Sequence, residues 1–251
     1  MAWYYDSHVH LSDPFYHSDF DHIVSGMERI NLKACCVSMD TADAKKTLEL
    51  AKSTDLVLPF IGIHPERARD DLDVMVDMIH QNNKSLSGIG EIGLDPTYCQ
   101  SAADSQRQVK VFETLLGLAE KYQKPVSIHS RKSLDDVLQI MTSYSTKHAL
   151  LHWFDGNKKQ LQKAMDMDFF VSFGPVLIYA EDKQTLLSKT RQSKVLVETD
   201  GPVRFSRCFE MKPAQVFFIP SVILCVSKVL GKSFEETCMM LETNSESYLG
   251  I

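Results

Sequence analysis

Features that would place this chain in a special class of protein are scarce among its 251 residues. It has 11 glycines, 9 prolines and no low-complexity tract, which excludes collagen-like and mainly disordered proteins. The longest charge-free stretch near the C-terminus covers residues 213–227. These 15 residues fall short of the roughly 20 apolar residues that a spanning helix needs. We therefore expect an ordinary globular protein without a membrane span.

Two further absences bear on location and partners. The six cysteines include no CxxC pair, and a chain of this length does not need disulfides, so we expect them to be reduced. The sequence does not start with a basic segment leading into an apolar one, which predicts no secretory signal and a cytoplasmic protein. The net charge of −6 speaks against a broad basic surface for long nucleic acid. It leaves room for a local basic mouth.

Short apolar segments alternate with longer amphipathic ones along the chain. Residues 103–122 show the helical pattern, because Val109, Phe112 and Leu116 recur at spacings of three and four. Residues 133–143 and 158–167 follow a similar pattern. The short segments are rich in β-branched and aromatic residues, which predicts eight strands. These cover residues 3–11, 32–39, 57–64, 86–94, 125–130, 149–154, 169–174 and 195–199.

Eight strands that each lead into a helix predict parallel pairing, and their near-continuous hydrophobicity predicts burial on both faces. The α/β fold that satisfies both is a closed TIM (β/α)8 barrel. An open doubly wound sheet is the alternative, but the G-x-G-x-x-G and P-loop motifs of such sheets are absent. Residues 214–230 and 234–241 read as extra C-terminal helices. Because no linker interrupts the pattern, we expect one domain over residues 1–251.

Two histidines stand together near the start of the chain, in Asp6-Ser7-His8-Val9-His10. Residues two apart on a strand point to the same face, so His8 and His10 are expected to share the barrel interior. Two such imidazoles form half of a metal site. A pair of hydrogen-bonded core histidines would give the same pattern.

Four more chemically active residues, Glu91, His129, His152 and Asp200, each end a separate strand-like segment. Their strand ends correspond to the side where barrel enzymes keep their active sites. A carboxylate inside a barrel is costly unless it is paired or metal-bound. Glycines flank Glu91, which we interpret as allowing close approach to a ligand. Four imidazoles and two carboxylates suit zinc, manganese or a similar ion, and a carboxylate can bridge two ions, so we expect a two-metal site.

The order of these motifs resembles the TatD family of metal-dependent hydrolases, within the wider amidohydrolase group. The resemblance runs through residues 6–10, 62–65, 90–95, 128–131, 152–156, 172–175 and 198–202. It implies a TIM barrel that hydrolyses DNA phosphodiesters, often from a 3′ end, with two divalent ions such as Mg, Mn or Zn. It also implies a ligand set. One ion would be held by His8, His10 and Asp200, the second by His129 and His152, with Glu91 bridging them.

Other roles follow for residues around these ligands. Asp200 and Glu91 are candidate catalytic groups, since Asp200 could accept a proton or serve only as a ligand. His64 follows a strand end, placed to hydrogen-bond a phosphate or position the nucleophile; packing of its loop is the alternative. Arg131 offers a planar fork for phosphate, or else a surface salt bridge.

Two loops depart from the family pattern. Asp95 is followed by Pro96-Thr97-Tyr98, where the family usually has aromatic residues at once. The loop after Pro202 contains Arg204 and Arg207 and lacks the usual aromatic-leucine continuation. These two arginines would supply a positive mouth, or would be solvated loop charges.

Three functions compete at this point. The first is a phosphodiesterase or nuclease acting on DNA, with a single-strand end preferred over a duplex. The second is an amidohydrolase or lactonase acting on a small molecule. Many relatives of that kind bridge their metals with a carboxylated lysine at the fourth strand, where this chain has Glu91, which favours the first. The third, a non-catalytic barrel used for binding, is disfavoured by the complete ligand set.

Overall fold

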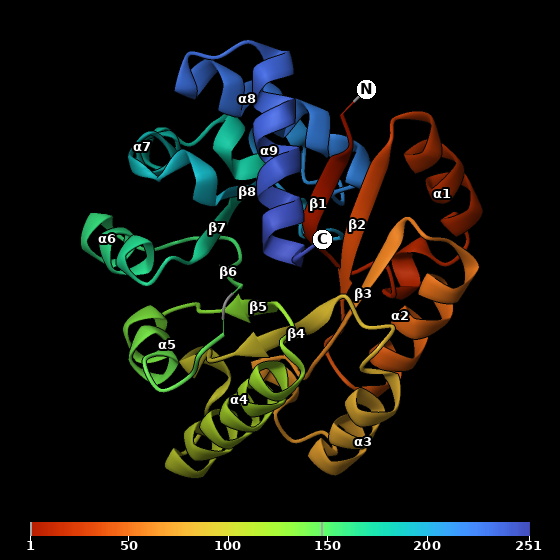
Figure 1. Ribbon diagram of the computed structural model, residues 1–251, viewed down its shortest axis with the longest axis vertical. Helices are drawn as coiled ribbons and strands as arrows, with labels where there is room; N and C mark the ends of the chain where they lie inside the picture. The colour runs from red at the N-terminus through yellow and green to blue at the C-terminus, as the bar shows by residue number, and fades with distance from the viewer. Residues whose placement is uncertain (1, 147) are drawn as a thin grey trace.

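The computed structural model describes residues 2–146 and 148–251. Its strands form one sheet in the order β1 to β8, and each neighbouring pair is parallel (Figure 1). The prediction of a TIM barrel is confirmed. The strands are β1 Tyr4–Val9, β2 Leu32–Val37, β3 Val57–Ile61, β4 Gly88–Gly93, β5 Val126–His129, β6 Ala149–Leu151, β7 Phe170–Phe173 and β8 Val195–Val197.

Helices follow the strands and surround the sheet in Figure 1. They are α1 Phe20–Arg29, α2 Thr41–Ser53, α3 Leu72–Asn82, α4 Ala102–Tyr122, α5 Leu134–Met141, α6 Lys158–Asp166, α7 Glu181–Lys189, α8 Ile219–Leu230 and α9 Phe234–Leu249. Helix α4 shows why they form: Phe112, Leu115 and Leu116 are fully buried on one face, and Ser101 caps the first turn by accepting from Asp104 N–H.

The barrel closes between its last and first strands by contacts that involve loop and side-chain groups. Asp200 N–H donates to His8 O at 2.9 Å, and His10 N–H donates to Gly201 O at 2.9 Å. Nearer the middle of the strands, Ser7 Oγ donates to Val197 O at 2.8 Å. The segment that closes the barrel therefore also brings His8, His10 and Asp200 together.

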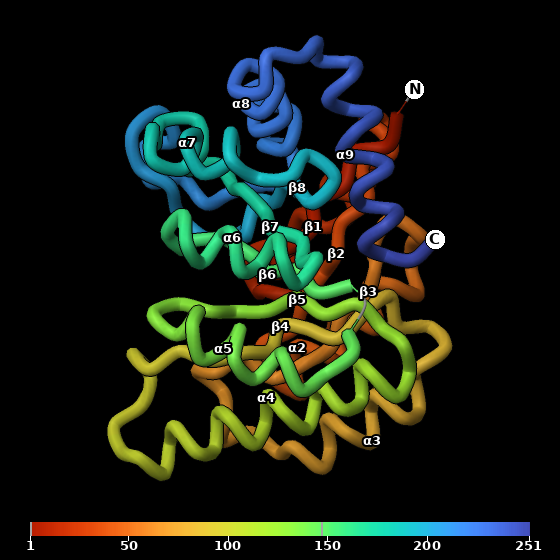
Figure 2. The backbone as a smooth tube through the Cα atoms, turned by 60° about the vertical axis from the view of Figure 1, so that its left-hand side comes forward, coloured from red at the N-terminus to blue at the C-terminus, as the bar shows by residue number. Residues whose placement is uncertain are grey.

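Helix α9 covers the amino-terminal end of the barrel, beside β1 and the N-terminus in Figures 1 and 2. Asn244 Nδ2 donates to Val195 O at the start of β8, at 2.9 Å. The buried ring of Tyr248 packs on Phe60 and Phe170, with ring centroids 6.0 and 5.6 Å away. An aromatic plug thus fills one end of the barrel, and the polar site occupies the other.

Several predicted boundaries were wrong. The strands expected at 149–154 and 195–199 end at Leu151 and Val197, because the backbone N–H groups two residues further on bond to side chains: Trp153 N–H to Glu198, and Thr199 N–H to Asp6. The helix expected at 214–230 begins only at Ile219. The one expected to stop at residue 241 continues to Leu249, since its polar last turns pack on the barrel.

Two further observations concern the described residues. No single helix among them is long and apolar enough to cross a membrane, although segments Val216–Leu230 and Phe234–Leu249 meet that test as a pair bent by 108°. All six cysteines lie outside disulfides, in agreement with the sequence prediction.

Candidate active site

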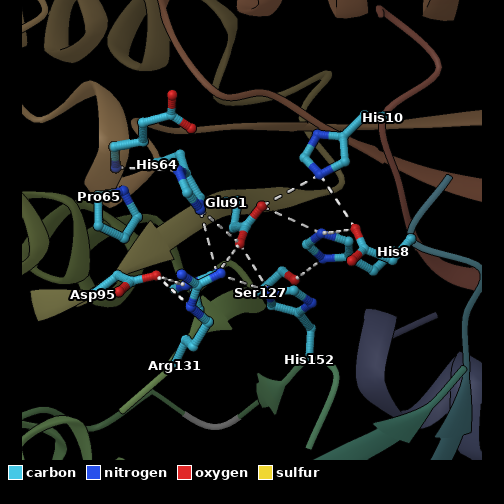
Figure 3. A network of polar contacts seen from close by, with 12 residues as sticks. His8, His10, His64, Pro65, Glu91, Asp95, Ser127, Arg131 and His152 are labelled. Carbon is cyan, nitrogen blue, oxygen red and sulfur yellow. Dashed lines mark hydrogen bonds and ion pairs between the residues drawn. The ribbon is translucent and has the colours of Figure 1, made fainter. Parts of the chain in front are cut away.

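Glu91 stands at the centre of the site, in β4, with 2% of its surface exposed (Figure 3). Its two carboxylate oxygens face two different groups of side chains. Oε2 lies 3.3 Å from His8 Nε2 and 3.4 Å from His10 Nε2. Oε1 lies 2.8 Å from both His129 Nδ1 and His152 Nε2. One carboxylate therefore joins two clusters of nitrogen and oxygen donors.

The first cluster combines the end of β1 with the loop after β8. Asp200 Oδ1 lies 3.4 Å from His10 Nε2 and 3.6 Å from His8 Nε2. Asp200 has φ of 50°, in the left-handed region, and its N–H bonds to His8 O. The backbone of β1 thus fixes the loop that carries the carboxylate.

The second cluster comes from the ends of β3, β5 and β6. His152 Nε2 lies 3.4 Å from His129 Nδ1. His64 Nε2 lies 3.3 Å from His129 Nδ1 and 3.5 Å from Glu91 Oε1. The structure thus brings together all six residues that the sequence analysis proposed as ligands, and it adds His64 at their edge.

A shell of polar side chains orients three of the histidines. Asp95 Oδ2 lies 3.0 Å from His129 Nε2, so an Nε2–H that donates there leaves Nδ1 free to face Glu91. Ser127 Oγ lies 2.8 Å from His8 Nδ1 and has the same effect on that ring. Glu198 Oε1 lies 3.9 Å from His152 Nδ1.

Sequence reasoning missed these orienting groups. Asp95 and Glu198 lie in two of the motifs that resemble the TatD family, residues 90–95 and 198–202. A second carboxylate near the same strand end was the sequence signal that could have identified them as orienting groups. Ser127 gave no signal, because a serine inside a strand is common and only the contact between β5 and β1 across the barrel interior reveals its partner.

The donor set fits divalent metal ions. Three combinations place one donor atom of each member within 4.8 Å of the others: His8, His10 and Glu91; His64, Glu91 and His129; and His8, His152 and Glu198. His8 Nε2 is buried and has no hydrogen-bond partner among the described residues, although it faces two carboxylates. Imidazole nitrogens and carboxylate oxygens are the ligands that Zn²⁺, Mn²⁺ and similar ions prefer.

Buried histidines and carboxylates lie close together in the site, and their proximity shifts the pKa values of several of them. Burial raises the pKa of Glu91, but the histidines around it, beginning with His152, outweigh burial and hold the pKa well below its usual value. Burial lowers the pKa of His152, yet Glu91 and Glu198 hold it well above its usual value. Burial lowers the pKa of His64 to about 3.

The glycines near Glu91, Gly90 and Gly93, lie where β4 packs against β5. A Cβ on Gly90 would lie 2.9 Å from Ser127 Cβ, and one on Gly93 would lie 2.0 Å from His129 O. Gly93 also has φ of 146°. These glycines therefore let β4 approach β5, and the expectation that they also allow close approach to a ligand stays a prediction.

A cavity of about 780 Å³ opens over the site. Arg131 lines it, with Nε 3.3 Å from Asp95 Oδ2 and Nη2 donating to Thr97 Oγ1 at 2.8 Å. The atypical loop after Asp95 thus holds this arginine. The structure places Arg204 and Arg207 elsewhere, since neither is among the lining residues.

Arg204 and Arg207 do not line this cavity, and the positive mouth expected from them stays a prediction. Arg204 Nη1 donates to Met211 O at 2.8 Å, which ties the loop to itself. Arg207 opens a short 3-10 helix. Carboxylates outnumber cations around the cavity, whose charged lining residues are Asp13, Glu66, Glu91, Arg131, Lys132, Asp135, Asp136, Asp155 and Asp200.

A barrel with histidines and carboxylates gathered at the carboxyl ends of its strands defines a metal-dependent hydrolase. The family model described as "TatD related DNase" matches residues 5–250, and the chain belongs to this family. Deoxyribonuclease TATDN3 of Homo sapiens is 28% identical over 211 residues, which are 78% of this chain and 77% of the relative.

Two other relatives extend the comparison. The uncharacterized metal-dependent hydrolase YabD of Bacillus subtilis is 24% identical over 250 residues, covering 96% of this chain and 97% of the relative. The crystal structure of YjjV, a TatD homologue from Escherichia coli, superposes with a TM-score of 0.90 at 20% identity, covering 99% and 98% of the two chains. The last comparison concerns the fold alone.

Proposed function

We propose that this protein is a two-metal phosphodiesterase that removes nucleotides from a single-strand DNA end, as its membership of the TatD-related DNase family suggests. One observation carries the proposal. The two oxygens of Glu91 face separate histidine clusters, as expected for a carboxylate that bridges two ions. His8, His10 and Asp200 would hold one ion, and His129 and His152 the other.

The remaining residues prepare the substrate for attack. When bound, the two ions would supply positive charge that lowers the pKa of a water molecule and polarises the phosphoryl oxygen. Asp200 lines the cavity, so its carboxylate is positioned to accept the proton of the attacking water.

His64 acts as a hydrogen-bond donor in this scheme. Its Nδ1 accepts from Glu66 N–H at 3.1 Å, which in the neutral ring places the proton on Nε2. A protonated Nε2 cannot bind a metal, so this contact favours donation to a phosphoryl oxygen or to the nucleophile. That interpretation separates His64 from the ligands, although its Nε2 lies near Glu91.

Arg131 would bind the phosphate. Asp95 and Thr97 hold its guanidinium at the cavity wall, and the group lies over the ring of Tyr98, 5.7 Å from the centroid. A fixed planar fork suits two phosphate oxygens. Arg204 and Arg207 receive no phosphate contact in this proposal, because they lie outside the cavity lining.

The preference for a single-strand end follows from the shape and charge of the mouth. The cavity has the size of a site for a small ligand, and it lies over a barrel rather than along an open groove. The exposed carboxylates at its rim, such as Glu66 and Asp136, would repel the backbone of a long duplex. A terminal nucleotide brings less charge past that rim.

The test is Glu91→Gln, with Glu66→Gln as the matched control at the rim. If Glu91 bridges two ions, the variant should lose at least about a hundredfold in kcat on an end-labelled oligonucleotide. Elemental analysis should show fewer metal ions per chain, while circular dichroism stays unchanged because the strands supply the core. Unchanged metal content and turnover would remove Glu91 from the site.

The same assay separates the nuclease from its alternative. Single-stranded and duplex oligonucleotides are compared under Mg²⁺, Mn²⁺ and Zn²⁺, alongside lactones and cyclic amides. Turnover of a lactone or cyclic amide, with no phosphodiester cleavage under any of these metals, would replace the proposal with a small-molecule amidohydrolase.

A further inference from the structure

Trp153 follows His152 directly and lines the cavity with part of its surface exposed. Neither the proposed metal site nor the proposed proton transfers use it. A large aromatic side chain thus stands next to a candidate metal ligand, where it adds apolar surface to the cavity wall. Its backbone and its ring are both held in unusual ways.

The backbone of Trp153 adopts φ of 42°, in the left-handed region that bulky residues rarely occupy. Such a conformation is strained and persists only where the surroundings impose it. Here the N–H donates to Glu198 Oε1 at 2.7 Å and to Ser172 Oγ at 3.2 Å. Both acceptors are fully buried, so the barrel itself fixes the direction of the side chain.

The ring of Trp153 is fixed from behind. It stacks on Phe205, with centroids 5.3 Å apart and planes inclined by 21°. Phe205 is 3% exposed and packs in turn on Phe209, 6.0 Å away. Phe205 covers one face of the indole and does not line the cavity, whereas Trp153 does.

The other aromatic candidate is already engaged. Tyr98 also lines the cavity, but the guanidinium of Arg131 lies over its ring and His64 packs against it, with centroids 5.9 Å apart. Tyr98 therefore supports Arg131, the residue proposed to bind phosphate. Trp153 offers a rigid surface over which no cation lies among the described residues.

We propose that Trp153 is a specificity-determining residue that stacks on the nucleobase of the terminal nucleotide. This inference rests on the proposed function, since it assumes that a phosphodiester occupies the metal site beside it. Base stacking on an aromatic ring contributes about 1–3 kcal/mol and tolerates every base. The ring would select nucleotide ends over other phosphodiesters without reading the sequence.

The first experiment compares Trp153→Ala and Trp153→Phe with the wild type on two oligonucleotides. One ends in a normal nucleotide and the other in an abasic tetrahydrofuran residue. On the normal end, Trp153→Ala should raise KM roughly 5- to 150-fold, the equivalent of the stacking energy. Trp153→Phe should restore most of the affinity, and the abasic end should be bound equally by all three proteins. Equal losses on both ends would overturn the proposal and give Trp153 a purely structural role.

The second experiment needs no catalysis, so it separates this inference from the proposed function. The chain has two tryptophans, and Trp3→Phe leaves Trp153 as the only tryptophan, whose emission can be excited selectively. Titration with dAMP should quench its fluorescence to saturation, whereas 2-deoxyribose 5-phosphate should have little effect. Equal responses to both compounds would overturn base stacking. Absence of oligonucleotide cleavage with selective dAMP quenching would instead reject the nuclease and retain the base-binding surface.

Discussion

At the scale of single residues, the site depends on groups that never touch the proposed metal ions. Asp95 is the clearest of them. It is fully buried, and hydrogen bonds from His129 and Thr97 outweigh the effect of burial and lower its pKa to about 2. It orients His129 on one side and Arg131 on the other. One carboxylate thus contacts both a proposed metal ligand and the arginine proposed to bind phosphate.

Asp95→Asn should weaken metal binding, because a carboxamide cannot match the charge that holds the His129 Nε2–H. Loss of such an orienting partner typically lowers metal affinity about 10- to 100-fold. Titration with metal–chelator buffers measures this directly. The control is Asp77→Asn, the same change on the exposed face of α3. Equal metal affinity in the two variants would show that Asp95 does not support His129.

Arg131→Ala tests phosphate binding. A charge-assisted hydrogen bond contributes about 1.5–3 kcal/mol, so KM for the oligonucleotide should rise at least roughly tenfold. The dependence of log affinity on log salt should become shallower by about 0.7 for one lost phosphate contact on a single strand. Arg204→Ala provides the comparison, since Arg204 bonds to Met211 O outside the cavity. If both variants behaved alike, the assignment of Arg131 would fail.

At the scale of elements, strand β4 lies close against β5 in the wall of the proposed active site. Gly93 is paired with His129 in the sheet register, and its φ of 146° suits glycine alone. The close approach brings Glu91 and His129 within 2.8 Å of each other. The site geometry therefore depends on the absence of a side chain at this position.

Gly93→Ala should destabilise the fold by at least about 2 kcal/mol, because the new Cβ meets His129 O and the backbone conformation is strained. The matched control is Gly117→Ala in α4, where nothing lies within 4 Å of the added Cβ. That change should stabilise the helix by roughly 0.5–1 kcal/mol. Urea unfolding measures both. Equal stability of the two variants would contradict the tight β4–β5 contact.

At the scale of the whole molecule, the barrel has two differently filled ends. Polar groups line the carboxyl end, and an apolar plug centred on Tyr248 fills the amino end. The Tyr248 hydroxyl is buried and has no hydrogen-bond partner among the described residues. Burial raises its pKa well above the usual value. The plug therefore gives the molecule a measurable response to alkaline pH.

A phenol whose pKa is raised by folding contributes its full stability below the unfolded pKa of about 10 and loses it as the pH rises further. Tyr248→Phe has no phenol to ionise in the unfolded chain. Its stability should be close to that of the wild type at pH 7, and the difference should shift in favour of the variant above pH 10. Thermal unfolding at pH 7 and pH 10.5 gives the two differences. A constant difference would rule out an ionisation-linked role for Tyr248.

The sequence by itself determined the eightfold alternation of strands and helices and the order of the motifs. It also determined the candidate ligands, since each ends a strand-like run and parallel strands in a barrel share one carboxyl end. His8, Glu91 and Asp200 are far apart in the chain, yet topology alone predicts that they meet. These predictions succeed because they depend on local periodicity and on chain connectivity.

Only the tertiary structure decided how the strands pack and which groups support the ligands. The partner of Ser127, the purpose of Gly93 and the position of Arg204 all depend on contacts between segments distant in sequence. The same holds for Trp153, whose backbone is fixed by Glu198. The local sequence around a residue carries no information about such partners. Hydrogen bonds and close packing depend on the distance between segments of the chain after the barrel closes.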